Sequence, residues 1–277
     1  MREKGLVGAF TEDWLALREP YDARARNSDV LSAVTEAVAG CQSISIVDLG
    51  CGIGATLRAL SSRLPRKQTW RLVDNNVGAL DCARAIAVGA GAGAEVRTIL
   101  LDLANDLHAA LDGPINIVTT SAFLDLVSQE WLEQLVGCTV ARHLPLYAAL
   151  TYDGRVALKP IDLRDEAVVA AVNRHQLGNK GFGPALGPNA PTCAISLFQA
   201  AGYNVVHGHS DWTFDPVDRE IQLEIFAAWA DAARETGAVP IADLDLWLGA
   251  RRDAVALGRS QLRIGHVDFL AQPVARP

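Results

Sequence analysis

The stretch Val47–Gly54, which reads VDLGCGIG, decides the fold of this chain. It completes the apolar run 44–47 and leads directly into the helical pattern 55–60. A short apolar strand that ends in alternate glycines and opens a helix forms a turn at which the backbone can approach a nucleotide-like ligand closely. The sequence therefore predicts a ligand-binding loop at the end of a buried strand.

Acidic residues end three consecutive predicted strands. Asp48 closes the first, Asp74 ends the second, and Asp102 follows the third. A ring of carboxylates would repel a pyrophosphate, whereas a sulfonium ion with an ammonium group, a ribose diol and an adenine amine offers donors and positive charge. The pattern favours S-adenosylmethionine (SAM) over NAD. The glycine spacing also satisfies the relaxed dinucleotide fingerprint, so an NAD-dependent oxidoreductase stays an alternative.

The glycine loop and the acids after it resemble those of class I SAM-dependent methyltransferases, over about residues 44–127. The resemblance implies a Rossmann-like fold, SAM as cofactor and S-adenosylhomocysteine (SAH) as product. It implies that Asp48 organises the loop and the amino-acid end of SAM, Asp74 holds the ribose hydroxyls, and Asp102 meets the adenine amine. The implied cofactor-binding residues are Arg18, Asp48, Gly50, Cys51, Gly52, Asp74, Asn75, Asp102, Leu103, Thr120 and Ser121.

Residues 119–121 (TTS) follow the fourth predicted strand, where this family lines the opening for methyl transfer. The next residues, 122–125, read AFLD and not the Asn-Pro-Pro-Tyr type of sequence of many amino-methylating nucleic-acid enzymes. That departure argues against DNA or adenine N6 as acceptor. The net charge of −7, without a concentrated Lys/Arg stripe, argues against nucleic-acid binding in general.

Length and composition predict one sizeable domain with elaborations, because the chain has 277 residues of which 50% are hydrophobic. No segment approaches about 18 to 20 uninterrupted apolar residues, and residues 1–5 lack a signal-peptide core. We therefore expect a cytoplasmic protein that does not bind membranes. The five cysteines are scattered singly, which argues against a disulfide framework and a structural zinc site.

Alternating strand and helix patterns predict an α/β fold with a doubly wound, mostly parallel sheet of seven strands. An N-terminal helical arm, residues 1–40, precedes a SAM-binding domain, residues 41–277. In the arm, Thr11 is a candidate N-cap and Pro20 interrupts the helical pattern. Ser128 is predicted to cap the helix after the fourth strand, and a helix over 77–88 to end in the repeat 89–93. The strands are predicted at 44–47, 70–73, 96–101, 115–118, 146–151, 203–207 and 262–270.

Two insertions distinguish the chain from a minimal fold of this kind. Residues 160–190 combine a helical run, 166–176, with a glycine- and proline-rich loop around Phe182, which we interpret as a lid over the acceptor. Residues 210–260 contain two helical stretches that are predicted to wall the acceptor pocket or to form a homodimer face. His207-x-His209-x-Asp211 resembles a metallohydrolase signature, but a tryptophan follows, so we predict local hydrogen bonds and no metal site.

Methyl transfer needs orientation of the acceptor, exclusion of water and, for a hydroxyl or ammonium acceptor, removal of one proton. His175, at the end of the predicted lid helix, is the first candidate for the base because a histidine has a suitable intrinsic pKa. Asp125 follows residues 119–121 within one helical turn and is the second candidate, although it could equally cap the next helix. His143 is the third. Arg18 in the arm is the candidate partner of the methionine carboxylate, with surface packing as its alternative.

The sequence thus predicts an enzyme, a SAM-dependent methyltransferase that moves a methyl group to an oxygen or nitrogen of a small-molecule acceptor. Three alternatives stay open. Intramolecular cyclisation of the aminobutyryl chain of SAM would use the same cofactor residues. An NAD-dependent oxidoreductase would use the same glycine loop. A SAM-sensing or scaffold subunit would bind SAM but lack a closed acceptor pocket.

Overall fold

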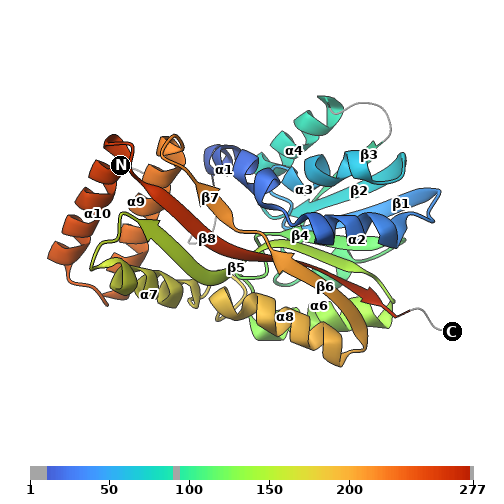
Figure 1. Cartoon of the computed structure of the whole chain (residues 1–277). Coiled ribbons are helices and arrows are strands. Elements are labelled where there is room, and N and C mark those ends of the chain that lie inside the picture. Colours follow the sequence, from blue (N-terminus) through green and yellow to red (C-terminus); the bar gives the residue numbers. More distant parts are fainter. Residues whose placement is uncertain (1–10, 90–93, 275–277) are drawn as a thin grey trace.

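A computed structural model describes residues 11–89 and 94–274, which form a central mixed sheet covered by helices (Figure 1). The strand order is β3-β2-β1-β4-β5-β8-β6, with the short β7 paired to β8. Strands β1 to β5 run parallel, and β8 is antiparallel to its neighbours. This confirms the predicted doubly wound sheet, with β7 as an eighth strand. The strands are β1 (Ser43–Leu49), β2 (Lys67–Asp74), β3 (Ala94–Leu100), β4 (Ile117–Ser121), β5 (Leu146–Lys159), β6 (Tyr203–His209), β7 (Trp212–Phe214) and β8 (Gln261–Pro273).

Helices cover both faces of the sheet. Helix α2 contacts β6 and β8 from one face, and α8 contacts β5, β6 and β8 from the other, with α6 beside it (Figure 1). None of the helices within the described ranges is long and apolar enough to span a bilayer. The helices are α1 (Glu12–Ala25), α2 (Ser28–Val38), α3 (Ala55–Leu60), α4 (Val77–Gly89), α5 (Leu107–Ala110), α6 (Gln129–Ala141), α7 (Asp165–Gln176), α8 (Ala190–Ala200), α9 (Arg219–Thr236) and α10 (Ile241–Ala256).

Both predicted N-caps are confirmed. The hydroxyl of Thr11 accepts a hydrogen bond from the Trp14 amide at 3.3 Å, and that of Ser128 accepts one from the Trp131 amide at 3.2 Å. Each bond satisfies an amide that a helix start leaves without a partner. Residues 90–93 of the predicted glycine-alanine repeat lie outside the described residues.

Several predicted boundaries are wrong. Helix α1 continues through Pro20, because Pro20 and Ala16 are both exposed, so water can satisfy the carbonyl that loses its partner. Residues 119–121 belong to β4 rather than to the turn after it. They pair with β5, and Thr119 and Thr120 also pair with β1, so the β-branched threonines extend a central strand.

Strand β5 is eight residues longer than the predicted strand 146–151 and pairs with β8 as far as Lys159. Asp153 and Gly154 read as a turn in the sequence, but they occupy an irregular stretch between Tyr152 and Val156 where the register with β8 shifts. Gly154 has a φ of +82°, which a β-bulge accommodates at low cost. The long β5–β8 ribbon projects beyond the other strands toward α7, α9 and α10 (Figure 1).

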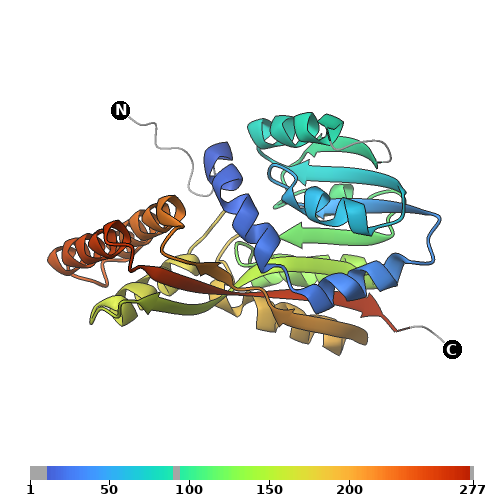
Figure 2. The ribbon, with the colours of Figure 1, turned by 45° about the horizontal axis from the view of Figure 1, so that its top comes forward.

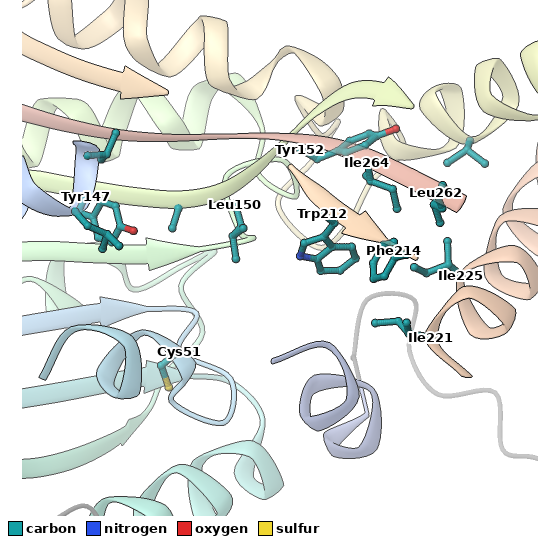
Figure 3. Packing of buried hydrophobic residues seen from close by; sticks show 14 of the residues in the cluster. Cys51, Tyr147, Leu150, Tyr152, Trp212, Phe214, Ile221, Ile225, Leu262 and Ile264 are labelled. Carbon is teal, nitrogen blue, oxygen red and sulfur yellow. The ribbon is translucent and has the colours of Figure 1, made fainter. Parts of the chain in front are cut away.

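One buried cluster joins the ribbon to the inserted helices. In Figure 3, Trp212 and Phe214 of β7 lie beside the ribbon, and Ile221 and Ile225 of α9 approach them from the other side. Helices α9 and α10 are packed together by Phe226 and Trp247, whose ring centroids are 5.8 Å apart in an edge-to-face contact. The inserted helices therefore pack into the same hydrophobic core as the β5–β8 ribbon.

Helix α1 lies between the sheet and the inserted helices (Figure 2) and is fastened there by the buried carboxylate of Asp268. Asp268 accepts hydrogen bonds from the amide of Leu150 at 2.7 Å, the amide of Asn27 at 3.0 Å and the hydroxyl of Tyr147 at 3.3 Å. Arg26, the residue after α1, donates to the same hydroxyl at 3.1 Å. Leu150 has a φ of +53°, so Asp268 holds a strained bend in β5 as well as the end of α1.

We expect Asp268→Ala to destabilise the protein by about 3 to 5 kcal/mol, because two amides and the Tyr147 hydroxyl lose their acceptor and the buried guanidinium of Arg26 loses a nearby negative charge. The exposed Asp231→Ala on α9, which removes only a surface pair with Arg234, is the control and should cost less than about 1 kcal/mol. Urea denaturation of both variants measures the difference. Equal losses would contradict this role of Asp268.

Candidate functional site

A pocket of about 570 Å³ opens at the carboxyl ends of β1 to β4, beside α1. Parallel strands place ligands at this edge of a doubly wound sheet. The glycine loop, the end of β2, the residues after β3 and β4, and part of the loop after α7 form its walls. The predicted cofactor residues that line it are Arg18, Gly50, Cys51, Gly52, Asp74, Asn75, Leu103 and Ser121.

The glycine loop is shaped by the close approach of the Phe123 ring to Gly50. Gly50 has a φ of +64°, and a Cβ built on it would lie 2.5 Å from the Cδ2 of Phe123. The amide of Cys51 donates to the carbonyl of Val73 at 3.0 Å, which ties the loop to the end of β2. A side chain at position 50 would displace Phe123 from the pocket wall, so glycine is required there.

Asp74 joins the glycine loop to the pocket. One carboxylate oxygen accepts a hydrogen bond from the amide of Gly52 at 2.8 Å, and the other accepts from the amide of Asn76 at 3.0 Å. Each oxygen can accept a second bond, and Asp74 lines the pocket. This arrangement suits two neighbouring hydroxyls of a ligand.

Three predicted cofactor residues do not line the pocket. Asp48 is fully buried beneath the loop, where one oxygen accepts from the hydroxyl of Thr119 at 2.8 Å and the other has no hydrogen-bond partner among the described residues. Burial raises the pKa of Asp48 to about 7. Thr120 is buried and donates to the carbonyl of Leu49 at 2.9 Å. Asp102 is exposed and accepts a hydrogen bond from the amide of Ala104 at 3.0 Å.

Arg18 and Asp22 of α1 form the wall opposite the glycine loop. The Nε and Nη2 of Arg18 donate to the two oxygens of Asp22 at 2.9 and 3.2 Å, and the guanidinium lies 4.7 Å from the ring centre of Trp212. The indole of Trp212 donates to the same carboxylate at 2.9 Å. The Nη1 of Arg18 takes no part in these bonds, so the guanidinium is held rigidly with one nitrogen still able to bind a ligand.

Asp125 is buried next to this wall, and its Oδ1 has no hydrogen-bond partner in the described part of the chain. Burial raises the pKa of Asp125 to about 6, although the positive charges of Arg18 and Lys180 favour its ionised form. A carboxyl group with a free oxygen and this pKa is suited to accepting a proton near neutral pH.

None of the three candidates for the base lines the pocket, although Asp125 lies between the lining residues Phe123 and Leu126 in the chain. His175 lies behind Lys180, with its Nε2 3.0 Å from Glu235 Oε2 and its Nδ1 3.3 Å from the Nζ of Lys180. His143 is exposed in the turn between α6 and β5, at the opposite edge of the sheet. Of the three candidates for the base, Asp125 has the buried, unpartnered atom.

The loop after α7 covers the pocket, and Lys180, Gly181 and Phe182 line it. The ring of Phe182 packs edge-to-face on Phe123 and Trp131, with centroids 5.4 Å away in both cases. The sequence predicts a lid around Phe182, whereas Lys180 is not among the predicted site residues. None of the described residues of the second insertion, 210–260, lines the pocket.

Asp153, His209 and Asp211 form a cluster whose ligand atoms could reach one cation. Arg155 already occupies it, because its Nη2 lies 2.6 Å from Asp153, 2.9 Å from His209 and 2.7 Å from Asp211. Arg263 also donates to Asp211 at 2.6 Å. His209 and Asp211 are therefore held by arginines of β5 and β8 rather than by the predicted local hydrogen bonds, and His207 is not one of the residues of this cluster.

A scan of protein-family models and a search of curated proteins find no match for this chain, but solved structures do match it. A cyclopropane-fatty-acyl-phospholipid synthase-like protein from Lactobacillus casei has a TM-score of 0.55 at 14% identity, covering 96% of this chain and 95% of that one. A candidate methyltransferase from Bacillus halodurans has a TM-score of 0.50 at 14% identity, covering 89% and 100%. The YcgJ protein of Bacillus subtilis has a TM-score of 0.50 at 11% identity, covering 90% and 100%. The chain has the Rossmann-like fold of class I SAM-dependent methyltransferases.

Asp48→Asn tests the electrostatics beneath the loop. The pKa of Asp48 in the folded protein, about 7, exceeds the ordinary value of 3.8. The protonated carboxyl therefore makes its full contribution to the stability of the wild type at low pH, and this contribution is lost as the pH rises through 7. Relative to wild type, the Asn variant should gain about 2 to 3 kcal/mol between pH 5 and pH 8. Urea denaturation at both pH values measures this gain. The exposed Asp231→Asn should show no such gain, and a pH-independent difference for Asp48→Asn would contradict the prediction.

Proposed function

We propose that the chain is an enzyme, a SAM-dependent methyltransferase that transfers a methyl group to an oxygen or nitrogen of a small-molecule acceptor. The observation that carries the proposal is the position of Asp74. Its carboxylate lines the pocket at the end of β2 while its bond to Gly52 holds the glycine loop beside it. This places acceptors for a ribose diol next to a loop that a ligand backbone can approach closely.

The pocket offers groups for each part of SAM. In this proposal Asp74 accepts the ribose hydroxyls, and Arg18 uses its Nη1 to bind the methionine carboxylate. Leu103 and Asn75 line the adenosine end, with Asp102 at the rim for the adenine amine. Asp48 and Thr120 act from below, where they support the loop without touching the cofactor.

The acceptor would lie under the lid residues Lys180 and Phe182, next to Asp125. SAM supplies a methyl carbon on a positive sulfur, and a lone pair of the acceptor forms the new bond as the electrons of the carbon–sulfur bond pass to sulfur. The Oδ1 of Asp125 takes the proton that a hydroxyl or ammonium acceptor must lose. Phe182, with Phe123 and Trp131, excludes water from the reacting groups. His175 does not touch this space and acts through Lys180.

The alternatives differ in their products. Methyl transfer leaves SAH, whereas cyclisation of the aminobutyryl chain leaves methylthioadenosine, so mass spectrometry of the nucleoside product separates them. A sensing subunit would release neither. Asp125 lies between the pocket-lining residues Phe123 and Leu126 in the chain, and its buried carboxylate supports a reaction that removes a proton, and so methyl transfer to a protic acceptor over simple binding.

Calorimetric titration with SAM, SAH and NAD is the first test of the cofactor. We expect micromolar binding of the two sulfur nucleotides and none of NAD. Asp74→Ala should weaken SAM binding by about 1.5 to 3 kcal/mol, the usual range for hydrogen bonds to a charged group. The exposed Asp81→Ala on α4 is the matched control and should bind as wild type does. Binding of NAD alone would overturn the proposal, and an unchanged affinity for SAM would remove Asp74 from the site.

Asp125→Asn tests the base. With an acceptor found by screening for SAH release, kcat/KM of the wild type should rise with pH up to about 6 and then level off, because the carboxylate form is active. The Asn variant should lose about 10²- to 10⁴-fold in kcat/KM and lack that inflection, while binding SAH normally. A variant that keeps both the rate and the inflection would exclude Asp125 as the base.

A further inference from the structure

Lys180 is a cation in the pocket that the transfer reaction itself does not use. It lies in the lid loop and lines the pocket beside Phe182. Its Nζ is 3.3 Å from His175 Nδ1, and no carboxylate of the described residues forms an ion pair with it. An ammonium group has three donors, so Lys180 keeps donors for a ligand.

Two further residues hold this lysine in place. An ammonium can only donate, so the Nδ1 of His175 must accept, and a neutral imidazole then carries its proton on Nε2. That proton points to Glu235 Oε2, 3.0 Å away. The series runs from Glu235 on α9 through His175 on α7 to the lid loop. Both insertions therefore contribute to fixing one lysine at the pocket.

The surroundings of Lys180 favour an anion on an apolar body. The walls next to it are the side chains of Phe182, Phe123 and Leu126. Glu235 and Asp125 are near enough for their charges to stabilise the ammonium, but burial of Lys180 lowers its pKa by a larger effect. A cation that is partly desolvated and lacks a direct ion pair gains from binding an anionic ligand.

We propose that Lys180 binds a carboxylate of the methyl acceptor, so that the substrates are small organic acids with an apolar or aromatic body. This inference rests on the proposed function, because it assigns the acceptor to the same pocket. Arg18 then serves the carboxylate of SAM and Lys180 that of the acceptor, and the charges of both cations act on Asp125. His175 and Glu235 are positioning residues that orient the ammonium.

The experiment titrates SAH-saturated protein with benzoate and with benzamide, its uncharged counterpart. We expect benzoate to bind at least about tenfold more tightly, a preference that follows from a charge-assisted hydrogen bond. Lys180→Met should remove the preference without changing SAH affinity, and Lys180→Arg should retain most of it. Lys67→Met, at the amino end of β2 and so at the opposite edge of the sheet, is the matched control.

A separate comparison tests His175 as a positioning residue. His175→Phe should reduce the benzoate preference severalfold, and His175→Gln, which can still accept from Lys180, should restore part of it. Equal loss in both variants would exclude positioning by His175.

The other outcomes separate the two proposals. Binding of SAH with equal affinities for benzoate and benzamide would overturn the acid-acceptor site and leave the proposed function standing. If Lys180→Met weakened SAH binding and left the benzoate preference intact, Lys180 would belong to the cofactor instead. Absence of SAH binding to the wild type would overturn both.

Discussion

The buried carboxylate of Asp268 is the interaction on which the arrangement of the pocket depends. Its hydrogen bonds to the amides of Leu150 and Asn27 join a bend in β5 to the junction of α1 and α2. The bend sends the β5–β8 ribbon toward α7 and α9. The junction keeps α1 beside the glycine loop, where Arg18 lines the pocket. A single acid in β8 thus positions both α1 and the ribbon that leads to α7 and α9.

Burial has a larger effect than ion pairing on the pKa values of the acids around the site. Within residues 11–89 and 94–274, Asp48 and Asp125 each keep one oxygen without a hydrogen-bond partner, and burial raises both pKa values toward neutral pH. Arg18 and Lys180 both supply positive charge that acts on Asp125. Ligands that bring a sulfonium, an ammonium group or a carboxylate would complete pairs that the protein alone leaves open.

The site was predictable where the chemistry is local and unpredictable where it depends on contacts far along the chain. The loop of Gly50 and Gly52 and the acid at Asp74 belong to one strand-turn-helix and the next strand, so their spacing predicts their proximity. Lys180 carries no such signal, because its loop is held at the pocket by pairing with distant residues, such as that of Phe182 with Val127. The intrinsic pKa of a histidine makes His175 a candidate base, but in the fold it contacts the lining residue Lys180 and does not line the pocket itself.

The sequence by itself determined the doubly wound sheet, the ligand loop and the N-caps, because each follows from periodicity or from hydrogen bonds between residues close along the chain. Only the tertiary structure decided that α1 runs through Pro20, that β5 continues past Gly154, and that the lid contributes a cation. Those outcomes depend on which surfaces are solvated and which distant strands pair. Such energies arise only when segments far apart in the chain are packed together.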